Sequence, residues 1–80
     1  MNFFPHHQHR IDVLAEILVT LRREKRLTTK QLATRLGKPE VFVLDYESGK
    51  CRLDLPELVD IADAIGIDMV ELINLYQRRA

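Results

Sequence analysis

The chain has 80 residues, of which 46% are hydrophobic, and a formal net charge of zero. This length predicts a single domain, and a composition with only three glycines and three prolines excludes a disordered or collagen-like chain. A single cysteine excludes an internal disulfide and a cysteine-based zinc site. The chain has no apolar run of membrane-spanning length and no signal peptide, so it is expected in the reducing cytoplasm.

The first predicted helix runs from about Arg10 to Lys25, because apolar residues recur at helical spacing between Ile11 and Leu21. Residues 1–9 precede it and are expected to form a flexible, histidine-rich N-terminal arm. The three histidines of the arm lack a fourth ligand in the sequence, so no metal site is expected there, and no cofactor motif is present.

Two short helices joined by a tight turn are predicted next, in residues 28–47. Thr28 is a favourable N-cap for the second helix, and Gly37 ends it with a positive φ. Pro39 disfavours helical backbone at the residue before it and presets φ for a third helix that runs from about Pro39 to Glu47. This is the layout of a helix-turn-helix unit, which makes nucleic acid the default partner.

The fourth and fifth helices each begin at an aspartate. Asp54 and Glu57 form a capping-box pattern, and Gly66 ends the helix that follows. Asp68 repeats the capping pattern with Glu71 at the start of the last helix, over residues 68–79. The prediction is an all-α domain of five helices and no strand, over residues 10–80.

These segments resemble the Cro and C1-repressor (XRE) type of helix-turn-helix family. The resemblance runs without gaps from about Leu21 to Leu72 and is carried by LTTKQLATRLG, by Tyr46 and Glu47, by the SGK that follows them and by LPELVDIADAIGIDMVELI. It implies the five-helix, lambda-repressor-like fold, with the third helix in the major groove of double-stranded DNA. It also implies a transcriptional regulator, most often a repressor that binds a palindromic operator as a dimer.

The resemblance assigns roles to residues on both sides of the turn. Arg22 and Glu47 match positions that form a buried ion pair between the first and third helices. The residues that match or flank the family's phosphate contacts are Thr28, Thr29, Lys38, Ser48, Lys50 and Arg52.

The third helix lacks the donor side chains that the family commonly carries on its outward face. Pro39, Val43 and Tyr46 share one face at helical spacing and are predicted to point inward. The opposite, base-facing positions are then Glu40, Val41, Leu44 and Asp45. Such a face is compatible with thymine methyls and cytosine amino groups, but two exposed aliphatic residues beside two acids also suit a protein interface. The alternative function is thus a helix-turn-helix-derived adaptor or antirepressor-like module without base readout.

Charge is unevenly distributed along the chain. Seven basic residues and one acid, Glu24, lie between Arg22 and Lys38, so the remainder of the chain carries the compensating negative charge. This distribution predicts a basic side that faces phosphates.

The last helix carries more apolar residues than its own core requires, which predicts a homodimer through residues 68–79, with the N-terminal arm as a further candidate contact. The alternative is that Leu72, Ile73 and Tyr76 only close the monomer core. No serine or threonine has a histidine spaced to act as its base, so the chain is not expected to be an enzyme.

Overall fold

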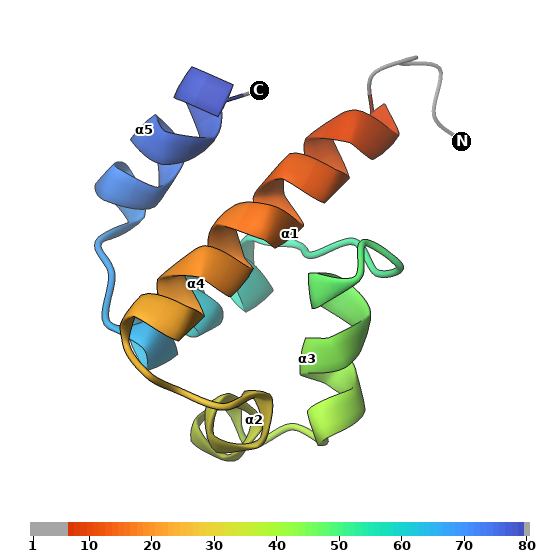
Figure 1. Cartoon of the computed structure of the whole chain (residues 1–80), viewed down its shortest axis with the longest axis vertical. Helices are drawn as coiled ribbons and strands as arrows, with labels where there is room; N and C mark the ends of the chain where they lie inside the picture. The colour runs from red at the N-terminus through yellow and green to blue at the C-terminus, as the bar shows by residue number, and fades with distance from the viewer. Residues whose placement is uncertain (1–6, 80) are drawn as a thin grey trace.

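The protein, a computed structural model, is described over residues 7–79, which form five α-helices and no strand. The helices are α1 (His7–Glu24), α2 (Thr29–Leu36), α3 (Glu40–Glu47), α4 (Leu55–Ile65) and α5 (Met69–Arg79). Helix α1 crosses the middle of the molecule, with α5 on one side of it and α3 on the other (Figure 1). The predicted all-α fold is confirmed. No helix in the described part is long and apolar enough to cross a membrane.

All five helices contribute to one hydrophobic core. Each supplies a side chain that is no more than 1% exposed: Leu18, Leu32, Val43, Ile61 and Leu72. Helix α2 packs against α3 and α4, while α1 packs against α3 and α5. Burial of each such side chain stabilises the fold by about 1.5–3 kcal/mol, so the short helices are held by packing rather than by their own propensity.

Helix α1 begins three residues earlier than the sequence predicted. Residues 7–9, assigned to a flexible arm, are the first turn of the helix, and this part of the assignment is corrected. Within this added turn, Gln8 Nε2 donates to Asp12 Oδ1 at 2.9 Å, one turn further on, and to the carbonyl of Gly49 at 3.4 Å. Residues 1–6, which include Phe3, Phe4 and the first histidine, lie outside the described residues.

The caps of the last two helices differ in form. Asp54 Oδ1 accepts from the amide of Glu57 at 2.8 Å, and Glu57 Oε1 accepts from the amide of Asp54 at 2.9 Å, which confirms the capping box. Asp68 Oδ1 instead accepts from the amide of Val70 at 2.7 Å, one residue before Glu71. The predicted repeat of the capping box at α5 is therefore corrected to a shorter side-chain cap.

Candidate nucleic-acid interface

The turn between α2 and α3 sets the direction of α3. Gly37 has a φ of 67° and a ψ of 30°, a left-handed conformation that glycine adopts without steric cost, and the amide of Lys38 donates to the carbonyl of Ala33 at 3.0 Å. Pro39 is extended, with a φ of −66° and a ψ of 151°, and is the N-cap of α3. The helix therefore begins at Glu40, and Pro39 is exposed instead of being part of the inward stripe predicted for it.

The inward face of α3 is made of Val43 and Tyr46, which are 0% and 2% exposed. Phe42 lies half-buried at the edge of this face and packs edge-on against Tyr46, with ring centroids 5.5 Å apart. Lys38 Nζ lies 5.4 Å from the centroid of the Phe42 ring, a cation–π contact. Packing thus fixes which side of α3 can face a partner.

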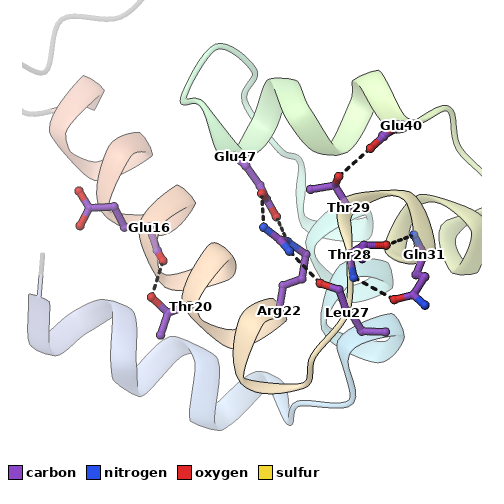
Figure 2. A network of polar contacts seen from close by, with 9 residues as sticks. All are labelled: Glu16, Thr20, Arg22, Leu27, Thr28, Thr29, Gln31, Glu40 and Glu47. Carbon is purple, nitrogen blue, oxygen red and sulfur yellow. Dashed lines mark hydrogen bonds and ion pairs between the residues drawn. The ribbon is translucent and has the colours of Figure 1, made fainter.

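A bidentate ion pair joins α1 to the end of α3 (Figure 2). Arg22 Nε donates to Glu47 Oε2 at 2.7 Å, and the Nη2 atom donates to Oε1 at 3.1 Å. The third bond from Arg22 goes to the carbonyl of Leu27, at 2.7 Å, in the turn before α2. Both charged side chains are only 10% exposed. Arg22 therefore ties together α1, α3 and the segment that leads to α2.

The outward face of α3, which we define as Glu40, Val41, Leu44 and Asp45, lies opposite this packing. Val41 is 55% exposed and Leu44 is 49% exposed, although both are large aliphatic side chains. Glu40 is exposed and Asp45 is half-buried. The outward face is therefore a small apolar surface with a carboxylate at each end.

The start of α2 contacts the start of α3 directly. Thr29 Oγ1 donates to Glu40 Oε2 at 2.7 Å (Figure 2), so this carboxylate is held against α2. Thr28 Oγ1 accepts from the amide of Gln31 at 3.0 Å, and Gln31 Oε1 accepts from the amide of Thr28 at 2.9 Å. The sequence predicted the Thr28 cap, but the roles of Gln31 at Thr28 and of Glu40 at Thr29 were not predicted. A Thr followed three residues later by Gln is a capping-box pattern and could have identified Gln31.

Exposed basic or hydroxyl side chains lie at both ends of α3. Lys38 precedes the helix, and Ser48, Lys50 and Arg52 follow it. Ser48 is the C-cap residue of α3, and its Oγ donates to the carbonyl of Asp45 at 2.9 Å. No ion pair engages Lys38, Lys50 or Arg52 within residues 7–79. No carboxylate in this part of the chain neutralises these three cations, so each can contact phosphate.

Two basic residues of the stretch between Arg22 and Lys38 make contacts within the fold. Arg22 is buried in its ion pair, and Arg35 Nη1 donates to the carbonyl of Ala64 at 2.9 Å, near the end of α4. Burial therefore removes Arg22 from the predicted basic side, while the other six basic residues of the stretch are exposed.

Comparison with known proteins assigns the chain to a family. The sequence profile of the helix-turn-helix domain matches residues 13–75. An XRE-family like protein from Pseudomonas syringae pv. tomato strain DC3000 is 34% identical in sequence, with 92% of this chain and 90% of that chain covered and a TM-score of 0.84. This chain belongs to the XRE-type helix-turn-helix family. A search of curated proteins found no match.

Two more distant structures share the fold of this XRE-type domain. The clp gene regulator ClgR from C. glutamicum is 18% identical, with 85% of this chain and 87% of that chain covered and a TM-score of 0.79. The restriction-modification controller protein C.Esp1396I, solved as a tetramer with its natural 35 base-pair operator, is 16% identical, with 86% and 91% covered and a TM-score of 0.81. Helices α1 to α5 thus have the same arrangement as those of two named regulators.

Proposed function

We propose that this XRE-type domain binds double-stranded DNA with α3 in the major groove and acts in the cytoplasm as a transcriptional repressor. The observation that carries the proposal is that α3 buries Val43 and Tyr46 and leaves its outward face exposed, with the cations Lys38, Lys50 and Arg52 before and after the helix. Helix α3 is short, is fixed to α1 by the Arg22–Glu47 ion pair and has free cations on both sides. Family membership and the fold shared with an operator-bound controller protein support the same role.

Phosphate contacts would come from the rim around α3. Lys38, Lys50 and Arg52 supply charge, and the first-turn amides of α2, with the hydroxyls of Thr28 and Thr29, supply donors at a helix N-terminus. Ser48 lies in the same loop as Lys50. With about three phosphates neutralised per copy, log affinity falls with log salt at a slope near −3 per copy.

Base contacts would come from the outward face of α3. Val41 and Leu44 suit the C5-methyl groups of thymine, and Asp45 accepts from the amino group of cytosine. Glu40 can do the same with the carboxylate oxygen that Thr29 does not occupy. Two carboxylates beside phosphates weaken non-specific binding, so a specific site depends on two copies acting together.

A homodimer through α5 supplies the second copy. Val70 and Ile73 are 67% and 44% exposed and share one face of α5, whereas Leu72 is buried at 1%. Leu55, at the start of α4, is 65% exposed. Leu72 and the half-buried Tyr76 therefore close the monomer core, and the exposed apolar residues on α5 form the proposed dimer surface. The tetramer of C.Esp1396I, which shares this fold, supports the proposed self-association.

Fluorescence anisotropy with a random-sequence duplex tests DNA binding over a range of salt concentrations. We expect binding at low salt that weakens steeply as salt rises. K50Q should lower the affinity and reduce the slope by about 1 per copy, while K25Q, which removes the same charge from the turn between α1 and α2, should change neither. Absence of binding at low salt, or equal effects of K50Q and K25Q, would contradict the proposal.

A protein partner for the outward face is the second candidate function, because an apolar pair of residues bordered by carboxylates is typical of a small protein interface. The module would then act as an adaptor or antirepressor. The two candidates differ in their response to L44E, which adds charge to the outward face. By the DNA proposal it should weaken duplex binding at low salt by about tenfold or more, whereas by the protein-partner alternative it should abolish the protein contact and leave duplex binding unchanged.

A further inference from the structure

The side chains on the outward face of α3 can accept hydrogen bonds from a partner but cannot donate them. Glu40 and Asp45 end in carboxylates, which only accept, and Val41 and Leu44 offer apolar surface, at 55% and 49% exposure. In the proposed complex with DNA, on which this inference rests, α3 lies in the major groove and these two kinds of group meet the base edges.

Each carboxylate of the outward face has an aliphatic neighbour one turn away. Glu40 and Leu44 are four residues apart on α3, and so are Val41 and Asp45. Residues at this spacing are neighbours on the surface of a helix. The face therefore presents an acceptor beside an apolar group twice, and a base that matches such a pair has a donor beside an apolar group.

Glu40 is held in place by a bond within the fold. Thr29 Oγ1 donates to its Oε2 atom at 2.7 Å, which leaves Oε1 to accept from outside (Figure 2). Glu40 is also the first residue of α3, and the N-terminal residues of a recognition helix are those that contact base edges. The pair of Glu40 and Leu44 is therefore the one best placed to read a base.

Each of the four ordinary bases matches such a pair incompletely in the major groove. Guanine shows two acceptors there, which repel a carboxylate, and adenine shows an acceptor beside its amino donor. Thymine shows a methyl group beside an acceptor, and cytosine shows an amino donor without a methyl group. 5-Methylcytosine shows the amino donor and, on the adjacent ring carbon, a methyl group, with no acceptor. Its edge thus complements both members of the pair.

We propose that the outward face of α3 binds duplex DNA containing 5-methylcytosine more tightly than the same duplex with unmodified cytosine. Glu40 accepts from the N4 amino group, and Leu44 contacts the C5 methyl group of the same base. Burial of one methyl group against Leu44 strengthens binding about fourfold per copy of the domain. The domain then senses the methylation state of its site, which the proposed regulator function does not include.

Selection from two duplex libraries tests the proposal with the full chain. One random-sequence library is made with 5-methylcytosine in place of every cytosine, and the other is the same library with ordinary cytosine. The enriched duplexes are then synthesised in both forms, and their affinities are measured by fluorescence anisotropy. We expect the duplex from the methylated library to bind about fourfold more tightly per copy in its methylated form than in its unmethylated form.

Two variants locate the preference on the pair. L44A removes most of the surface that meets the methyl group, so the two forms of the duplex should bind it almost equally. E40Q converts the acceptor to an amide, which suits adenine, so selection with E40Q should replace the cytosine by adenine at the position that is read. The control is D63N, which changes an exposed carboxylate on α4 and should alter neither the methyl preference nor the selected base.

The outcomes separate this proposal from DNA binding itself. Equal affinity of the wild type for the two forms, or an unchanged methyl preference in L44A, would overturn the proposal and leave the regulator function standing. Enrichment from the ordinary library alone would do the same. Absence of binding to either library at low salt would contradict the regulator function as well.

Discussion

The buried ion pair between Arg22 and Glu47 carries the sharpest prediction for the fold. In E47L the Arg22 guanidinium, only 10% exposed, loses two of its three bonds and keeps only the carbonyl of Leu27. Removal of one partner of a buried pair costs about 3–5 kcal/mol, against a total stability of about 4–12 kcal/mol for a domain of this length. A loss of about 3 kcal/mol lowers Tm by roughly 12–24 °C.

Urea and thermal unfolding followed by circular dichroism measure this loss in a double-mutant cycle. R22M should be destabilised to a similar degree as E47L, while R22M/E47L should recover much of the loss because no charge is left buried. The control is E16Q, since the ion pair of Glu16 with Arg79 is at the surface, with side chains 66% and 47% exposed, and should cost less than about 1 kcal/mol. Equal losses in E47L and E16Q, or additive losses in the double mutant, would refute the reasoning.

Three further predictions concern α3 and α5. Burial, and next the carboxylate of Glu47, raise the pKa of Tyr46 from its usual 10.0. Above pH 10 the phenol therefore ionises in the unfolded chain before it ionises in the folded one, and the fold loses stability as pH rises. In urea unfolding above pH 10, the free energy of unfolding of the wild type should fall by about 1.4 kcal/mol per pH unit more than that of Y46F. E40Q/D45N should strengthen binding to random duplex severalfold in the anisotropy assay, because it removes two carboxylates from the outward face. I73E should weaken self-association by about tenfold or more in analytical sedimentation, since a charge replaces an apolar residue of the proposed dimer surface.

Each of the three has a result that contradicts it. Parallel stability curves of the wild type and Y46F above pH 10 would mean that the phenol ionises equally in both states. Unchanged affinity of E40Q/D45N would mean that α3 does not approach the duplex. For α5, a monomeric wild type at micromolar concentration, or equal effects of I73E and T34E, an exposed position on α2, would contradict the dimer.

Local signals predicted the helices well because the caps and turns of this chain are strong. Gly37 takes the positive φ that its place after α2 requires, and Asp54 and Glu57 form the capping box that their spacing predicts. The inward positions of Val43 and Tyr46 followed from helical periodicity alone. Arg22 and Glu47 lie far apart in sequence, so only the family resemblance pointed to their pairing.

What the sequence could not provide depends on contacts between distant segments. In the first turn of α1, Gln8 bonds to the carbonyl of Gly49, and Arg35 on α2 bonds to the carbonyl of Ala64 near the end of α4. Helical periodicity says nothing about such bonds. Formal charge along the chain also does not reveal which charged side chain is buried, so Arg22 was counted in the basic side although it is 8% exposed.

The central claim is that the outward face of α3 contacts duplex DNA, and methyl NMR of Val41 and Leu44 tests it most directly. Addition of a duplex enriched by selection from a random library should shift the methyl signals of these two residues and leave those of the buried Leu32 and Ile61 in place. Binding of the duplex without any change at Val41 and Leu44 would contradict the claim, as would failure of every selected duplex to bind.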